Sequence, residues 1–163
     1  MDPERPWAKW ADPAPGTGTA VHVTREFPVP REEVFRAWTD PELFRQWFRP
    51  GQGSTPSAEM DVRPGGEYRV TIERPPEAPG TTYLVGTYLE VVPPERLVYT
   101  FGWEGTPYLE QLEDVDSRVI VQFRDLGGST EVSITHERLD TEELRAFHRW
   151  GWAGALERLA DVV

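Results

Sequence analysis

Hydrophobic and polar residues alternate with a period of two along much of the chain, which is the pattern of strands with one buried face. The first run covers residues 19–27, and about six more lie between residues 57 and 138. Turn signals rich in proline and glycine separate them: Pro64-Gly65-Gly66, Pro75-Pro76, Pro93-Pro94 and Gly127-Gly128. Because strands and helices do not alternate, the pattern predicts an antiparallel sheet.

Two of these segments carry features of their own. Met60 and Val62 predict a short strand that ends at the first turn signal. The longest segment runs from Tyr83 to Val91, and Gly86 within it predicts a bulge or a sharp bend, because glycine weakens a strand interior.

Two short helices are predicted directly after the first strand. Pro30 suits the first turn of a helix, and the hydrophobic residues Val34, Phe35 and Trp38 follow at helical spacing. Asp40-Pro41 ends this helix and begins another, because aspartate caps a helix and proline is tolerated at its first position. The second helix has the apolar face Leu43, Phe44, Trp47 and Phe48.

A long helix is predicted at the C-terminus, with Asp140 and Thr141 as alternative N-cap residues. Its apolar stripe consists of Leu144, His148, Gly151, Trp152, Ala155, Leu159 and Val162. Gly151 and Gly154 lower helix propensity, so a helix that carries both is expected to lie very close to its neighbour.

The order of elements predicts an α+β fold. In its simplest packing, a strongly curved antiparallel sheet of about six to seven strands wraps round the long C-terminal helix, and the two short helices support that helix at one end. Residues 1–18 are rich in proline and glycine and are interpreted as a tail; residues 19–163 form a single domain. Trp7 and Trp10 in the tail either dock loosely or cover an apolar groove.

Charge and composition exclude several classes of function. The chain has 28 acidic residues against 17 Lys and Arg, a net charge of -11, which disfavours nucleic acid and anionic membranes as partners. Cysteine is absent, which removes disulfides and thiolate metal sites. The chain shows no membrane span and no secretory signal, so a cytoplasmic location is expected.

Several segments together resemble a known family. They are Val34-Phe35-Arg36-Ala37-Trp38-Thr39-Asp40-Pro41, Trp47-Phe48-Arg49-Pro50-Gly51, Arg63-Pro64-Gly65-Gly66-Glu67-Tyr68, Gly86-Thr87-Tyr88-Leu89-Glu90-Val91 and His148-Arg149-Trp150-Gly151-Trp152. In this order they are similar to the SRPBCC (START-type, helix-grip) superfamily, in the bacterial branch that resembles the activator of the heat-shock chaperone ATPase. The resemblance spans about Val21 to Leu159 and implies the helix-grip fold.

The resemblance also implies a cavity between the sheet and the C-terminal helix that holds an apolar or amphipathic small molecule. Members of the superfamily include lipid carriers, aromatic polyketide cyclases, hormone receptors and co-chaperone domains, so the fold does not select one activity. The signature residues suit structural roles: Trp38, Trp47 and Trp152 as core anchors and Gly151 for close approach of helix and sheet.

Two histidines are the first candidate site residues. His136 lies in phase with Val132 and Ile134 on the last strand, and His148 lies on the apolar stripe of the final helix. Both are expected to face one interior, either as the polar end of a ligand cavity or as buried histidines bonded to neighbouring groups. Two histidines are too few for a metal site, and we expect neither metal nor cofactor.

Aromatic residues make up 12% of the chain, and several lie in phase with aliphatic residues on the strands. The predicted cavity lining, besides the two histidines, is Tyr68, Tyr83, Tyr99, Phe101, Trp103, Phe123 and Trp152. The alternative is an ordinary solid core. An acidic loop follows Trp103, and Tyr108, Leu109 and Leu112 give it an apolar side, so it is either a solvated loop or a lid.

These observations leave three hypotheses. The first is a protein that binds a small hydrophobic molecule in the cavity. The second is a cyclase or hydrolase in which His136 or His148 acts as acid or base. The third is a co-chaperone-like module, which is disfavoured because no companion module accompanies the domain. The oligomeric state stays open, a homodimer included.

Overall fold

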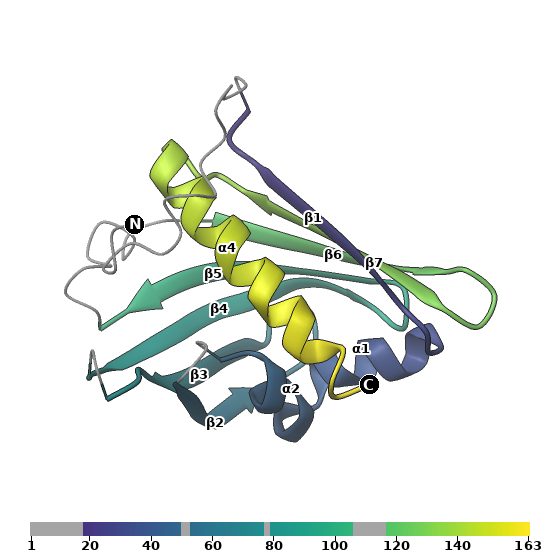
Figure 1. The fold of residues 1–163 in the computed structure, drawn as a ribbon, viewed down its shortest axis with the longest axis horizontal. Coiled ribbons are helices and arrows are strands. Elements are labelled where there is room, and N and C mark those ends of the chain that lie inside the picture. The colour runs from purple at the N-terminus through teal and green to yellow at the C-terminus, as the bar shows by residue number, and fades with distance from the viewer. Residues whose placement is uncertain (1–17, 50–52, 77–78, 106–116) are drawn as a thin grey trace.

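The computed structural model describes residues 18–49, 53–76, 79–105 and 117–163. Figure 1 shows the elements, which are, in chain order, β1 (Val21–Phe27), α1 (Arg31–Thr39), α2 (Pro41–Trp47), β2 (Ser54–Met60), β3 (Glu67–Glu73), β4 (Thr81–Val92), β5 (Arg96–Glu104), β6 (Ser117–Asp125), β7 (Thr130–Glu137) and α4 (Glu142–Leu159). The tail at residues 1–17, with Trp7 and Trp10, lies outside the described residues.

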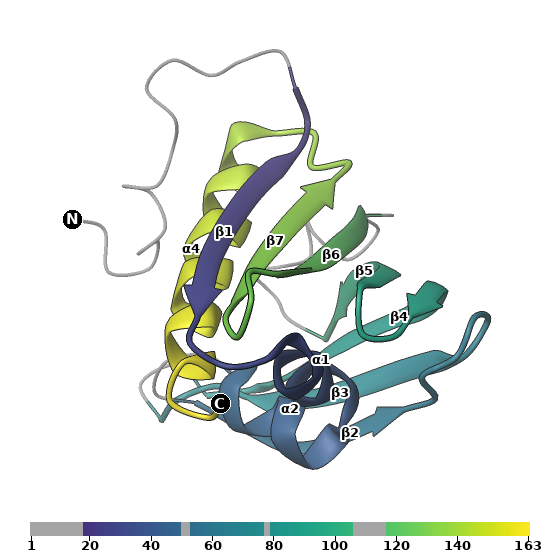
Figure 2. The same ribbon diagram turned by 90° about the vertical axis from the view of Figure 1, so that its right-hand side faces the viewer.

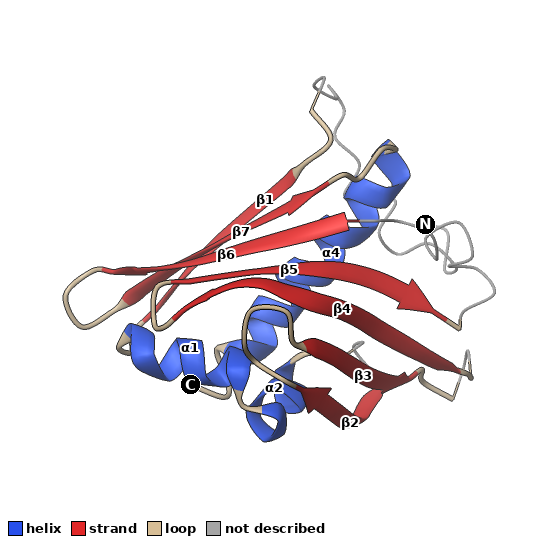
Figure 3. Cartoon of the chain, turned by 180° about the vertical axis from the view of Figure 1, so that it is seen from behind, coloured by secondary structure: helices blue, strands red, loops and turns tan. Residues whose placement is uncertain are grey.

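The strands form one antiparallel sheet in the order β1-β7-β6-β5-β4-β3-β2. Figure 2 shows the sheet bent so that its two halves lie on different sides of α4, and Figure 3 shows α1 and α2 at one end of the sheet. The predicted α+β architecture, with a curved seven-stranded sheet around the C-terminal helix, is confirmed. None of the described helices is long and apolar enough to cross a membrane.

The helices begin where local capping chemistry favours them. The Asp40 carboxylate accepts a hydrogen bond from the Glu42 backbone N–H at 3.0 Å, with Pro41 at the first helical position. At the start of α4, Thr141 rather than Asp140 is the N-cap, and its hydroxyl accepts from the Leu144 N–H at 3.1 Å. The sequence therefore located both helix starts to within a residue.

Strand β2 differs from its prediction. It covers Ser54–Met60, whereas Val62 lies in the turn that follows, where the Asp61 N–H donates to the Glu67 carbonyl at 3.0 Å. β2 is one of the two edge strands of the sheet, and of its residues only Thr55 is buried. A largely exposed edge strand needs no hydrophobic face, so period-two alternation does not reveal it.

The core is centred on tryptophans from the helices, as predicted. Trp38, Trp47 and Trp152 are 2%, 0% and 3% exposed. The ring centroids of Trp38 and Trp47 lie 4.5 Å apart, and the Trp38 indole packs edge-on against Phe123 of β6. This aromatic cluster fixes α1 and α2 against the sheet and closes one end of the fold.

Gly86 marks a place where β3, β4 and β5 approach unusually closely. Between Val85 and Tyr88 the β4–β5 ladder opens: the Thr87 N–H donates to Thr100 Oγ1, and the Thr100 carbonyl accepts from the Tyr68 hydroxyl at 2.5 Å. The register shift itself falls slightly later, between Tyr88 and Glu90. A Cβ on Gly86 would lie 2.0 Å from the Thr100 carbonyl oxygen.

We expect Gly86→Ala to lower the free energy of unfolding by about 1–3 kcal/mol, because the methyl group displaces the Tyr68 hydroxyl from its buried acceptor. Urea denaturation measures the loss. Gly102→Ala on β5 is the matched control, since the nearest atom to its added Cβ is 3.7 Å away, and it should change stability by less than about 0.5 kcal/mol. Equal effects of the two substitutions would contradict this account of Gly86.

Candidate binding cavity

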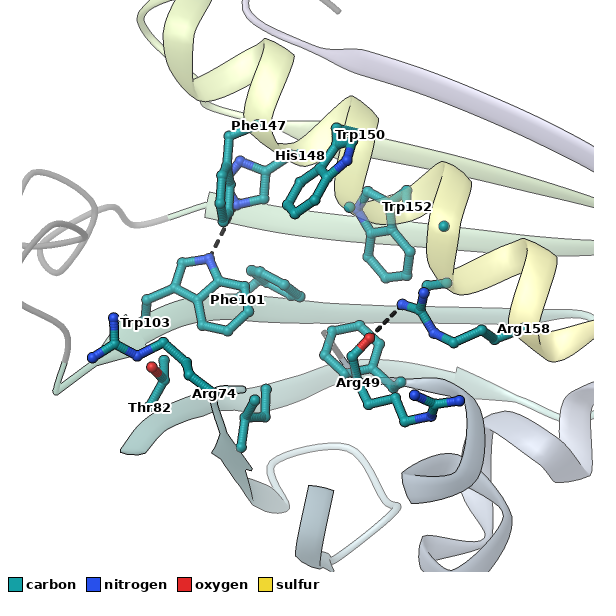
Figure 4. A pocket seen from close by; sticks show the side chains of 15 residues that line it. Arg49, Arg74, Thr82, Phe101, Trp103, Phe147, His148, Trp150, Trp152 and Arg158 are labelled. Atoms are coloured by element: carbon teal, nitrogen blue, oxygen red, sulfur yellow. Dashed lines mark hydrogen bonds between the residues drawn. The ribbon is translucent and has the colours of Figure 1, made fainter. Parts of the chain in front are cut away.

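A cavity of about 320 Å³ lies between α4 and the concave face of the sheet. Figure 4 shows that α4 forms one wall, strands β3 to β5 form the opposite wall, and the segment after α2 closes one end. Most of its lining is apolar: Phe48, Ile72, Phe101, Trp103, Phe147, Trp150, Gly151, Trp152, Gly154 and Ala155. Its polar lining residues are Arg49, Arg74, Thr82, His148 and Arg158.

The glycines of α4 contribute to this cavity in a way that differs from the prediction. The expected close approach of helix and sheet at Gly151 is wrong, because a Cβ there would meet no atom within 4 Å. At Gly154 the nearest atom would be an end nitrogen of the flexible Arg158 side chain, at 3.3 Å. Gly151 therefore leaves open space between the helix and the sheet, and the cavity occupies it.

His148 is held in one tautomer by its neighbours. Its Nδ1 lies 2.8 Å from the Leu144 carbonyl, which only accepts, so Nδ1 carries the proton. Nε2 therefore accepts from the Trp103 indole N–H at 3.1 Å. Burial lowers the pKa of His148 to about 4, so this imidazole is neutral at pH 7.

His136 has the opposite tautomer for a similar reason. Its Nδ1 accepts from the Trp152 indole N–H at 3.1 Å, so Nε2 carries the proton and donates to the Ser117 hydroxyl at 2.9 Å. That hydroxyl in turn donates to the Phe101 carbonyl at 2.6 Å. Burial, and then the neighbouring His148, lower the pKa of His136 well below its ordinary value.

The two histidines therefore face one interior, as the sequence indicated, with ring centroids 4.5 Å apart. Each ring nitrogen already has a hydrogen-bond partner. The arrangement matches the alternative of buried histidines bonded to neighbouring groups. A histidine that accepts a proton from a substrate or bonds a ligand would first have to release an indole, a hydroxyl or a carbonyl.

The amino-acid sequence matches a known protein family. Residues 28–163 match the family described as "Activator of Hsp90 ATPase homolog 1-like protein". The chain belongs to this AHSA1 family. The match covers most of the chain and confirms the resemblance that the sequence motifs indicated.

Solved structures with the AHSA1-family fold come from several organisms. A protein from Chromobacterium violaceum is 26% identical, with a TM-score of 0.74 over 89% of this chain and 96% of that one. An AHSA1 protein from Silicibacter pomeroyi is 23% identical, with a TM-score of 0.74 over 87% and 95% of the two chains. A protein from Nitrosomonas europaea is 23% identical, with a TM-score of 0.72 over 91% and 96%. No curated protein matches the chain.

The predicted lining residues of this AHSA1-family chain fall into three groups. His148, Phe101, Trp103 and Trp152 line the cavity. Four others are buried in the core and do not line the cavity: His136, Tyr68, Tyr99 and Phe123. Burial raises the pKa of the Tyr68 and Tyr99 hydroxyls, so both stay neutral.

Tyr83 lies outside the cavity altogether, which corrects its assignment as a lining residue. It is on the outer face of the sheet, with the Arg69 guanidinium 4.1 Å from its ring centroid. The inward face of β4 instead presents Thr82, Leu84 and Tyr88, all buried. Both faces of β4 carry hydrophobic residues, so the alternation alone could not show which face is inside.

Several lining residues were missed by the sequence reasoning. Phe147 and Trp150 of α4 flank the apolar stripe instead of lying on it, and they are half-buried. Arg49 follows α2, Arg74 follows β3 and Arg158 lies on α4, and no local motif links them. The one available signal is the excess of aromatic residues on α4, which extends beyond a single helical face.

The basic lining residues differ in what they already bind. Arg158 donates from Nε to the Trp47 carbonyl at 3.1 Å and from Nη2 to the Arg49 carbonyl, so it covers the C-terminal carbonyls of the α2 region. Burial and then Arg49 lower its pKa below the ordinary value. Arg74 donates from Nη2 to the Pro79 carbonyl at 3.0 Å.

Two other predictions have different outcomes. The apolar side of the acidic loop, with Tyr108, Leu109 and Leu112, lies outside the described residues. Among the residues that the structure describes, no group of three or more His, Asp or Glu side chains is placed to hold a metal ion. The expectation that the protein needs no metal stays a prediction.

Proposed function

We propose that this AHSA1-family protein binds a small hydrophobic or amphipathic molecule in the cavity between the sheet and α4. The observation that carries the proposal is a largely apolar cavity of about 320 Å³, with Gly151 among its lining residues. Ligand pockets have volumes of roughly 300–1,000 Å³ and mostly apolar walls with a few polar groups. This cavity lies at the small end of that range, which favours a compact ligand.

Two aromatic side chains of the cavity wall are held in fixed orientations by hydrogen bonds. The indole N–H groups of Trp103 and Trp152 donate to the two histidines. The surfaces that these two residues present to the cavity are therefore the apolar faces of their rings. Rings fixed by hydrogen bonds lose little freedom when a ligand stacks on them, which favours affinity. The same bonds leave no ring nitrogen of His136 or His148 unoccupied for acid–base work, so they favour binding over the cyclase or hydrolase alternative.

A co-chaperone-like role has less support from the described residues. A docking surface for a large protein is expected to present a contiguous apolar patch. The exposed large hydrophobic residues among those described are Leu89, Val92 and Leu126, which come from β4 and from the turn between β6 and β7. Scattered single residues of this kind are common on any protein surface.

Filling the cavity is expected to abolish binding. In Gly151→Leu the new side chain occupies the space above the sheet, so the affinity for the neutral fluorescent probe N-phenyl-1-naphthylamine should fall at least about tenfold. Fluorescence titration measures the affinity. Native mass spectrometry of the freshly purified wild-type protein should in addition reveal a retained small molecule, which is absent from the variant.

Glu157→Leu is the matched control, since it adds the same side chain to an exposed position of α4 outside the cavity lining. It should bind the probe as the wild type does. If neither this probe nor its anionic counterpart 1-anilinonaphthalene-8-sulfonate binds to the wild type, or if Gly151→Leu binds them equally well, the binding function is wrong.

A further inference from the structure

Within the described ranges, the charged residues of the cavity lining are all of one sign. Arg49, Arg74 and Arg158 line the cavity, and none of the Asp and Glu residues that the structure describes is among its lining residues. The chain as a whole is the reverse, with 28 Asp and Glu against 17 Lys and Arg. A basic lining inside an acidic protein is therefore a local feature of this cavity, and in a partly desolvated space its charges act more strongly than they would in water.

The basic groups lie at two ends of the cavity, and the two ends differ. Figure 4 shows Arg49 and Arg158 at one end, joined by the bond from the Arg158 guanidinium to the Arg49 carbonyl. Arg158 also donates to the Trp47 carbonyl, so this end serves to cover the C-terminal carbonyls of the α2 region. Its guanidinium thus has a structural function that needs no ligand.

The other end contains the buried hydroxyl of Thr82. Thr82 is 3% exposed, and its Oγ1 has no hydrogen bond within the described part of the chain. Figure 4 shows Arg74 near Thr82 at this end, below Trp103. Buried polar groups are nearly always hydrogen-bonded, so an unpartnered hydroxyl in a cavity wall indicates a position that a ligand's polar group would occupy.

We propose that the cavity selects an amphipathic anion, whose negatively charged group lies between Arg74 and Thr82 and whose apolar body lies against Phe101, Trp103 and Trp152. The proposal rests on the binding function above and specifies its ligand class. An arginine N–H and a hydroxyl both donate to an anionic oxygen, and such charge-assisted bonds are stronger than neutral ones. A carboxylate and a sulfonate share this chemistry.

A matched pair of probes tests the charge. 1-Anilinonaphthalene-8-sulfonate differs from N-phenyl-1-naphthylamine by one sulfonate group. The ratio of their affinities therefore reports whether the negative charge strengthens or weakens binding. We expect the anionic probe to bind at least about tenfold more tightly to the wild type at low salt. Similar affinities, or tighter binding of the neutral probe, would overturn the proposal while leaving the binding function intact.

Substitutions test where the charged group lies. Arg74→Gln should weaken binding of the anionic probe about tenfold more than binding of the neutral probe. Thr82→Val should also weaken binding of the anionic probe more than that of the neutral one, by about a few-fold. Arg124→Gln, which removes an exposed arginine of β6, controls for the change in net charge. The placement of the charged group between Arg74 and Thr82 would be overturned by either of two results. One is that Arg49→Gln weakens binding of the anionic probe while Arg74→Gln does not. The other is that Arg124→Gln weakens it as much as Arg74→Gln does. Thermal denaturation of each variant verifies that it is folded.

Discussion

Acidification from pH 7.5 to 5 is expected to destabilise the protein by at least about 2 kcal/mol, because His136 and His148 are buried in their neutral forms. Burial lowers the pKa of His148 to about 4 and that of His136 well below its ordinary value, which is about 6.5 in an unfolded chain. Between these values the unfolded state binds protons that the folded state does not. Stability is therefore complete above about pH 6.5 and falls as the pH falls toward 4.

The size of the loss follows from the pKa difference. His148 alone contributes about 2 kcal/mol between pH 7.5 and 5, and His136 adds to this loss in the same direction. The loss runs against the general electrostatics of the chain, because protonation reduces a net charge of -11 and so lowers self-repulsion. A fall in stability over this range is therefore specific to groups that resist protonation.

Urea denaturation at pH 7.5, 6.5 and 5 measures the effect. His148→Gln removes one titrating ring while its amide retains a donor for the Leu144 carbonyl and an acceptor for the Trp103 indole, so it should show a smaller loss. His22→Gln removes an exposed imidazole and should retain the wild-type loss. If the His148→Gln protein loses as much stability as the wild type, the histidines are not the cause.

Trp47→Ala is expected to cost about 3–5 kcal/mol, enough to unfold a marginally stable domain. The Trp47 ring is fully buried and packs against Trp38, Phe44 and Phe48. Its indole N–H also donates to the Ala37 carbonyl at 3.0 Å. That carbonyl lies four residues before Pro41, which has no N–H to continue the helical bonding, so the indole supplies the missing donor.

Trp47→Phe separates packing from hydrogen bonding. It keeps an aromatic ring in the core but leaves the Ala37 carbonyl without its donor, so its cost should be about 1–2 kcal/mol. Guanidinium denaturation monitored by circular dichroism measures both variants. A Trp47→Ala protein that is as stable as Trp47→Phe would show that the volume of the ring contributes nothing, contrary to the packing described above.

The bonds of the histidine pair link stability to the cavity. Trp103 and Trp152 form part of its wall, and each is oriented by one histidine. Protonation of either ring would remove the acceptor that holds its indole. Because burial lowers the pKa of both histidines, both rings are neutral at pH 7 and both acceptors are available to the indoles.

The amino-acid sequence by itself determined the order and type of the elements, because periodicity, caps and turn residues act over a few neighbouring positions. It identified α1, α2 and α4, the tryptophan anchors and the two inward histidines in this way. The bounds of strand β2 were wrong because an exposed edge has no hydrophobic period, and Tyr83 was misplaced because β4 is hydrophobic on both faces.

Only the tertiary structure decided what lies opposite each face. A glycine such as Gly151 fits both close packing and open space, and the sheet across from it determines which. The tautomer of His136 depends on partners 16 and 19 residues away in the chain, and the Nε2 partner of His148 is 45 residues away. The cavity's arginines and Thr82 come together from separate elements, because a curved sheet closing on a helix brings distant positions to one surface.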